Sequence, residues 1–220
     1  MIERLQWLRQ NFSMPIQHEI YLKKQYLNPK VIYDIGSCTL HWYDMARRIW
    51  PDAKIYVFDA MQNADVYYAS QGLDHYAGLL GDQDGDVVNF WSNAQHPAGN
   101  SIYRENPVYS PQVDKIYSDQ HKSYKLTRTL DSVIEQYNWP KPDLIKMDVQ
   151  GSELNILKGA VKCLEHVTDL ILEVQSLEYN IDAPMVDQIT DYLKLKDFQL
   201  IADRFSGDHI QGDAHYKKLI

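Results

Sequence analysis

The sequence predicts an α/β fold in which helices flank a mostly parallel β-sheet. From about residue 31 onward, short apolar segments alternate with segments of helical periodicity. The chain has 220 residues, of which 45% are hydrophobic and 24% are charged, as is ordinary for a globular protein with one core. Alternation of this kind is typical of β-α-β units, in which a crossover helix returns the chain to start a parallel strand.

Seven segments have the length and composition of strands in one sheet: residues 31–35, 55–58, 75–80, 144–147, 170–174, 198–202 and 216–220. Helices are expected between them, over residues 40–50, 63–71, 130–137, 152–164 and 185–195. A further strand is expected at residues 87–91. Because two strands follow the last helix directly, we expect the final strand of the sheet to run antiparallel.

The chain is expected to divide into an N-terminal helical extension, residues 1–28, and one main domain, residues 29–220. In the extension, apolar residues keep helical spacing over residues 2–8 and again over 16–21. Residues 92–122 are rich in Pro, Asn, Ser and Tyr. A loop this long inside a compact domain is usually functional or mobile, so we expect an insertion that shapes a ligand site.

Composition excludes several classes of protein. The formal net charge is −8 and there is no long basic run, which argues against a generic nucleic-acid binder. No apolar run approaches the roughly 20 residues that span a bilayer, and the N-terminus has no apolar signal core. Cys38 and Cys163 fit no metal-ligand spacing. We therefore expect a cytoplasmic protein with reduced thiols and no transmembrane segment.

Acidic residues and glycines follow three of the expected strands, at the sheet edge where open α/β sheets bind ligands. Asp34 and Gly36 stand at the end of the first strand; the glycine permits a sharp turn and a close approach to a ligand. Asp59, 25 residues after Asp34, is placed to accept hydrogen bonds from ribose hydroxyls. Gly81 and Asp82 end the third strand, where the acid can accept an adenine amino group. An ordinary turn residue is the alternative in each case.

The segment DLIKMDVQGSE, residues 143–153, carries the strongest signal. Strand alternation places Lys146 and Asp148 on the same face, and a lysine in a buried strand needs a partner or a cavity. Glu173 ends the next strand and is expected beside Asp148. Glu153 starts the following helix, where the helix dipole already favours an acid. Asp148, Glu153 and Glu173 are also suited to Mg²⁺, although their spacing does not imply a metal.

Together these segments resemble the FkbM-type methyltransferase family, over roughly residues 31–200. The most specific part is TLDSVI at 129–134, followed by LIKMDVQGSEL at 144–154 and LKGA at 157–160. It is similar to the family pattern TLD, IKIDVEGAE and LKGA. Three positions depart from that pattern: Leu40 replaces the last glycine of the first loop, Gln150 replaces a glutamate, and Ala60 stands where proline is common.

The resemblance implies a Rossmann-like methyltransferase fold and transfer of a methyl group from S-adenosylmethionine, usually to a hydroxyl of a sugar, glycan or natural-product acceptor. The cofactor-binding residues it implies are Asp34, Gly36, Ser37, Asp59, Ala60, Gly81, Asp82 and Asp148. For catalysis we expect Asp148, assisted by Lys146 or Glu173, to orient or deprotonate the acceptor hydroxyl. His96 and His121 in the insertion are alternative bases.

The acceptor is expected to contact the insertion through rings or a cation there: Tyr103, Arg104, Tyr109, Tyr117 and Tyr124. Alternatively, these aromatic residues could form the contact between two copies of the chain in a homodimer, since such a contact has a similar composition. Two other functions were weighed. A nicotinamide-dependent oxidoreductase requires G-x-G-x-x-G after the first strand, which residues 34–40 do not supply. A non-catalytic nucleotide-binding or interaction module that keeps the fold, suggested by Leu40 and Gln150, stays open.

Overall fold

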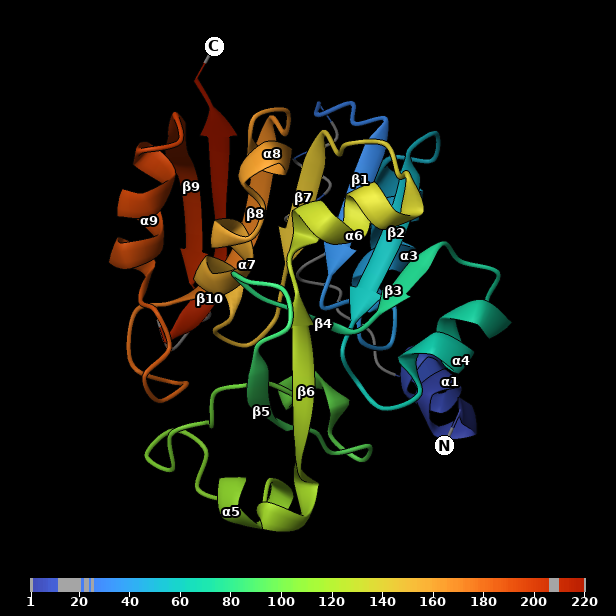
Figure 1. The fold of residues 1–220 in the computed structure, drawn as a ribbon, viewed down its shortest axis with the longest axis vertical. Helices are drawn as coiled ribbons and strands as arrows, with labels where there is room; N and C mark the ends of the chain where they lie inside the picture. Colours follow the sequence, from blue (N-terminus) through green and yellow to red (C-terminus); the bar gives the residue numbers. More distant parts are fainter. Residues whose placement is uncertain (1, 12–20, 22–23, 25, 206–209, 220) are drawn as a thin grey trace.

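The computed structural model describes residues 2–11, 21, 24, 26–205 and 210–219. A seven-stranded sheet in the order β3-β2-β1-β7-β8-β10-β9 forms its centre, with helices on both faces (Figure 1). The strands are β1 (Val31–Ile35), β2 (Lys54–Asp59), β3 (His75–Ala77), β7 (Leu144–Met147), β8 (Asp169–Gln175), β9 (Phe198–Phe205) and β10 (Gln211–Lys218). The mostly parallel sheet is confirmed, and β10 runs antiparallel to both neighbours, as expected.

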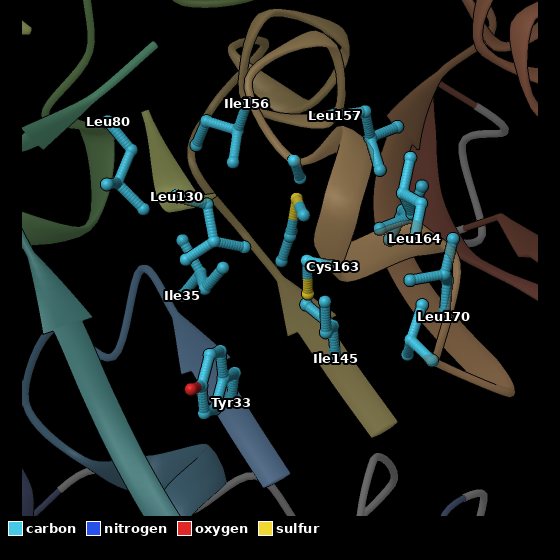
Figure 2. Packing of buried hydrophobic residues seen from close by; sticks show 14 of the residues in the cluster. Tyr33, Ile35, Leu80, Leu130, Ile145, Ile156, Leu157, Cys163, Leu164 and Leu170 are labelled. Atoms are coloured by element: carbon cyan, nitrogen blue, oxygen red, sulfur yellow. The ribbon is translucent and has the colours of Figure 1, made fainter. Parts of the chain in front are cut away.

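Each face of the sheet packs against its own helices. The helices are α1 (Ile2–Asn11), α3 (His41–Ile49), α4 (Ala64–Ser70), α6 (Leu130–Tyr137), α7 (Glu153–Lys158), α8 (Val161–Leu164) and α9 (Val186–Lys194). One apolar cluster joins the sheet to α6, α7, α8 and α9, and the other joins it to α1, α3 and α4. Figure 2 shows the first cluster, in which Ile145, Cys163 and Leu170 lie close together. Cys163 is a buried free thiol.

The single helix expected over residues 152–164 is wrong, because the chain breaks between α7 and α8. Gly159 lies at the break, and a β-carbon there would be 2.1 Å from the carbonyl oxygen of Gly81. The backbone of the helix pair therefore touches the backbone that follows β4 (Leu79–Leu80), and only glycine allows that approach.

The expected third strand over residues 75–80 is also divided. Residues 75–77 stay in the main sheet as β3, whereas β4 pairs with a second, three-stranded sheet in the order β4-β6-β5. β5 (Val87–Trp91) has the expected bounds, and β6 (Lys122–Arg128) was not predicted. The segment KSYKLTR does not have the pattern of a buried strand, because Tyr124 and Leu126 are exposed on β6 and provide no buried apolar face.

The insertion lies beyond the carboxyl ends of the parallel strands, at the lower end of Figure 1. Between β5 and β6 it contains two short 3₁₀ turns, η1 (Pro97–Gly99) and η2 (Asp119–His121), and one helical turn, α5 (Val113–Ile116). The small sheet thus holds the insertion over the edge of the main sheet where ligands are expected.

The N-terminal helix is fixed to the domain. The Nε and Nη2 atoms of Arg9 donate to the carboxylate of Asp44 on α3, at 2.7 and 2.6 Å, and its Nη1 atom donates to Gln71 at 2.8 Å. Most of the second expected helix, over residues 16–21, lies outside the described residues. Within the part of the chain that the structure describes, no helix is long and apolar enough to cross a bilayer.

Candidate active site

The ends of β1, β2, β7 and β8 bring the expected acidic residues to one edge of the sheet. Asp34 is paired in register with Lys146 of the neighbouring strand. The charges of Asp148 and Asp59 both act to raise the pKa of Asp34, so the three carboxyl groups are close in space. Glu173 on β8 lies beside Asp148, as expected from the strand order.

The loop after β1 is held in an unusual backbone shape. Gly36 has φ +85°, and a β-carbon on it would be 1.9 Å from the carbonyl oxygen of Asp148. Cys38 and Leu40 also have positive φ angles, 43° and 71°. Leu40 therefore takes the left-handed conformation that glycine adopts at no cost. It is fully buried, so its side chain contributes to the core while its backbone is strained.

Ser37 and Asp59 connect the β1 loop to β2. The hydroxyl of Ser37 donates to the carbonyl oxygen of Asp34 at 2.6 Å and accepts from the backbone N–H of Phe58 at 3.2 Å. The carboxylate of Asp59 accepts from the N–H groups of Cys38 and Met61, both at 2.7 Å. Each carboxylate oxygen keeps a second lone pair, so Asp59 can still accept from a ligand hydroxyl.

Asp34 is buried, with 1% of its surface exposed, and its Oδ2 atom has no hydrogen-bond partner among the described residues. Burial raises the pKa of Asp34 to about 7, although the Lys146 charge opposes the rise. Because the charged form of a buried carboxyl group costs free energy, Asp34 titrates near neutral pH.

Lys146 is paired, as its burial requires. Its ammonium lies 3.1 Å from Asp213 of β10 and 3.8 Å from Asp148. Burial disfavours the charged form, but the two carboxylates outweigh it and raise the pKa of Lys146 well above its ordinary value. Asp213 also accepts from the hydroxyl of Tyr21 at 2.8 Å. Sequence reasoning missed Asp213, because its position opposite Glu173 of β8 depends on the antiparallel return of the last strand.

Gln150 joins the two acids. Its Nε2 atom donates to Asp148 Oδ1 at 3.0 Å and to Glu173 Oε2 at 2.6 Å. A glutamine amide has two hydrogens, so one side chain satisfies both carboxyl groups. Burial, followed by the charge of Asp148, raises the pKa of Glu173 well above its usual range. The sequence identified Gln150 only as a departure from a family pattern, and not as a site residue.

Glu153 has a structural partner. Its Oε1 accepts from the N–H of Val149 at 3.0 Å, which closes the turn before α7. Burial raises the pKa of Glu153 to about 7. Among the described residues, no three His, Cys, Asp or Glu side chains are grouped so as to hold a metal ion.

Two adjoining cavities open at this edge. The first, of about 260 Å³, is lined by expected cofactor residues such as Asp59 and Ala60, by apolar side chains, and by Glu173. The second, of about 490 Å³, extends from Ser37 and Lys146 toward α1 and α3. Five residues line both cavities: Gly36, Cys38, Pro97, Ala98 and Asp148.

Some of the expected site residues do not line either cavity. Asp34, Gly81 and Asp82 line neither cavity, and Asp82 is exposed. His96 lines the second cavity, whereas His121 instead closes the η2 turn with Ser118.

The five insertion residues that were expected to contact the acceptor lie in different environments. Tyr117 lines the second cavity. Arg104 pairs with Asp114 at 2.6 Å, and Tyr109 stacks on Tyr179. The hydroxyl of Tyr103 donates to Asn155, and Tyr124 is 74% exposed.

Residues 34–200 match a family model described as the methyltransferase FkbM domain. Hexuronic acid methyltransferase AglP of Haloferax volcanii is 26% identical over 116 residues, covering 51% of this chain and 48% of that protein. AMB antimetabolite synthetase AmbE of Pseudomonas aeruginosa is 27% identical over 135 residues, covering 61% of this chain and 6% of that protein. The matched segments span less than half of either relative.

Solved structures show a similar fold. An S-adenosylmethionine-dependent methyltransferase from Clostridium acetobutylicum superposes with a TM-score of 0.51 at 12% identity. The superposition covers 96% of this chain and 94% of that one. The expected Rossmann-like methyltransferase fold, with its seven-stranded sheet and antiparallel last strand, is thereby confirmed.

Proposed function

This chain belongs to the FkbM methyltransferase family, and on that premise we propose that it is an O-methyltransferase acting on a hydroxyl group of a sugar, glycan or natural product. That it is an S-adenosylmethionine-dependent methyltransferase follows from the family and the fold. The oxygen acceptor and its chemical class are the proposed part. A sugar acceptor has a precedent in AglP, whose name describes a hexuronic acid methyltransferase.

The position of Asp148 carries the proposal. It lines both cavities, at the boundary where they meet. A transferase of this kind needs the donor and the acceptor on two sides of one reacting position, held in line. We assign the first cavity to the cofactor and the second to the acceptor, so that a carboxyl group lies where the two substrates meet.

The residues of the first cavity fit S-adenosylmethionine. Phe58, Leu80 and Phe90 provide apolar walls for an adenine ring. Asp59 has lone pairs for ribose hydroxyls, and Gly36 leaves no side chain between the loop and the ligand. When bound, the cofactor supplies an electrophilic methyl group on a sulfonium, whose sulfur keeps the bonding electron pair as the methyl group leaves.

Asp148 acts on the acceptor. As the hydroxyl oxygen forms its bond to the methyl carbon, its proton passes to the Asp148 carboxylate. Lys146, fixed by Asp213, holds one side of Asp148, and Gln150 holds the other. Burial and the charge of Asp148 raise the pKa of Glu173, which disfavours a second negative charge beside Asp148. Positioning contributes roughly 7–11 kcal/mol at best.

The test has two steps. Calorimetry compares S-adenosylmethionine, its demethylated product and NAD; we expect the two sulfur compounds to bind and NAD to be silent. Incubation with labelled S-adenosylmethionine and a panel of sugars, glycans and hydroxylated natural products should then give an ether product that survives mild base. A methyl group found on nitrogen or carbon contradicts the proposal. Cofactor binding without transfer to any acceptor supports the non-catalytic alternative.

A further inference from the structure

The second cavity contains two buried N–H groups without well-aligned acceptors. The Nε atom of Arg4 and the indole Nε1 of Trp42 are both buried, and neither has a well-aligned acceptor among the described residues, although the Trp42 indole contacts the hydroxyl of Tyr21. Both residues line the second cavity. An indole nitrogen can only donate, and a buried donor without a partner is costly. Oxygen atoms of a ligand are the natural acceptors for these two groups.

Arg4 is held in place by the helix that carries it. Leu5 and Leu8, which follow Arg4 on the same helix, are buried, at 2% and 8% exposure. Arg9, one turn further along, binds Asp44 and Gln71. The guanidinium of Arg4 lies 4.6 Å from the centre of the Trp7 ring, which supports its flat face and leaves its edge for hydrogen bonds.

The two cations that line the second cavity, Arg4 and Lys146, differ in their ion pairs. Lys146 is neutralised by Asp213 and Asp148. Arg4 makes no ion pair within the described ranges of the chain. The cavity also contains the carboxyl groups of Glu105, Asp148 and Asp213. These groups repel a doubly charged phosphate more strongly than a singly charged carboxylate, and a planar carboxylate also matches one arginine fork.

We propose that the second cavity binds an acceptor that carries a carboxylate, such as a sugar acid, with the carboxylate on Arg4 and Trp42 and the reacting hydroxyl at Asp148. The cavity extends from Arg4 to Asp148, so one molecule spans both ends. This inference rests on the proposed O-methyltransferase function and names the chemical class of its acceptor. It also assigns a role to the N-terminal helix, which lies before the matched family domain.

The experiment titrates glucuronate, and separately glucose, into the protein saturated with S-adenosylhomocysteine. Two-dimensional ¹H–¹⁵N NMR resolves the indole signals of the 5 tryptophans, and the Trp42→Phe variant assigns one of them. We expect glucuronate to shift the Trp42 signal saturably and glucose to leave it in place. Arg4→Gln should weaken glucuronate binding about tenfold or more, as expected for the loss of a charged hydrogen bond.

Arg48→Gln is the matched control, because it removes the same charge from an exposed position on α3. It should leave glucuronate binding unchanged, and neither arginine variant should change the affinity for S-adenosylhomocysteine. Weaker cofactor binding in Arg4→Gln would assign Arg4 to the cofactor and overturn the inference. An unmoved Trp42 signal, or equal binding of the two sugars, would also overturn it.

Product analysis separates this inference from the proposed function. If glucuronate binds through Arg4 but receives no methyl group on oxygen, the carboxylate site stands and the assigned reaction is wrong. If hydroxyl methylation occurs equally in wild type and Arg4→Gln, the reaction stands and the carboxylate site is wrong. A base-labile methyl ester would place the carboxylate at Asp148 and overturn the assigned orientation.

Discussion

The loops after β1 and β7 lie side by side at the same edge of the sheet, yet their polar groups are used differently. In the β1 loop, N–H groups are satisfied within the protein: those of Gly36 and Ser37 donate to Phe58, and that of Cys38 donates to Asp59. In and beside the β7 loop, ionisable groups face one another. Asp148 and Glu173 share one amide, and Lys146 lies beneath them.

This difference suggests separate roles for the two loops of the site. A loop whose groups are already paired provides shape, and changes in it should alter stability and cofactor affinity. A loop that gathers charges beside a cavity provides reactivity, and changes in it should alter turnover. Each prediction below tests this division.

The largest effect is expected for Asp148→Asn, which keeps the side-chain size but removes the base. Turnover should fall about 10²- to 10⁴-fold, the usual contribution of a positioned acid or base, while affinity for S-adenosylhomocysteine should fall far less. Steady-state kinetics and calorimetry make the comparison, with Asp86→Asn, an exposed acid before β5, as the control. Retained turnover would remove Asp148 from the reaction.

Asp34→Asn tests the β1 side through stability. The pKa of Asp34 is raised from 3.8 to about 7 in the folded protein by burial, so folding favours its protonated form. The wild type should therefore lose stability as pH rises from about 4 through 7, by at most roughly 4 kcal/mol. The asparagine variant should lack this loss.

Urea unfolding at pH 5 and pH 8 checks the prediction for Asp34. The variant should be the more stable protein at pH 8, and the difference in free energy of unfolding between the two proteins should be smaller at pH 5. Parallel pH dependence of the two proteins would show that Asp34 does not titrate as the buried carboxyl group described above.

Leu40→Gly sets backbone strain against core packing. Glycine should relieve about 1 kcal/mol of strain at φ +71°, but loss of the buried side chain costs about 2–5 kcal/mol. We expect net destabilisation of about 2 kcal/mol, measured by urea unfolding. Leu40→Ala is the matched variant: it should be less stable than Leu40→Gly, the reverse of the order at ordinary positions.

Gln150→Glu should have the smallest effect, a decrease in turnover of about tenfold. It replaces the shared donor with a third carboxyl group, which raises the pKa values of its acidic neighbours. The acidic limb of the pH–rate profile should move upward by about one pH unit. Gln150→Asn, which shortens the side chain without adding charge, should lower turnover without that movement. A profile that stays in place in Gln150→Glu would contradict the bridging role.

Local patterns predicted most of the main sheet and the positions of Lys146 and Asp148, since strand alternation and acidic strand ends are local properties. The sequence could not predict features that depend on distant contacts. β6 lacks an apolar face and forms only because β4 and β5 lie on either side of it.

The same limit applies to the site. Asp213 reaches Lys146 from the last strand, and Arg4 and Trp42 meet at one cavity although they are far apart in sequence. Gln150 was visible as a neutral residue between two expected acids. Its bridging role, however, required the geometry of both strand ends.

The near-contact between Gly36 and the Asp148 carbonyl oxygen, where a β-carbon would be 1.9 Å away, has a mechanical consequence. The β1 loop, which we propose binds the donor, and the backbone of Asp148, which we propose as the base, are in direct main-chain contact, with no room for an added methyl group between them. Their separation is thus set by backbone contact, so the gap that the transferred carbon must cross is fixed before either substrate arrives.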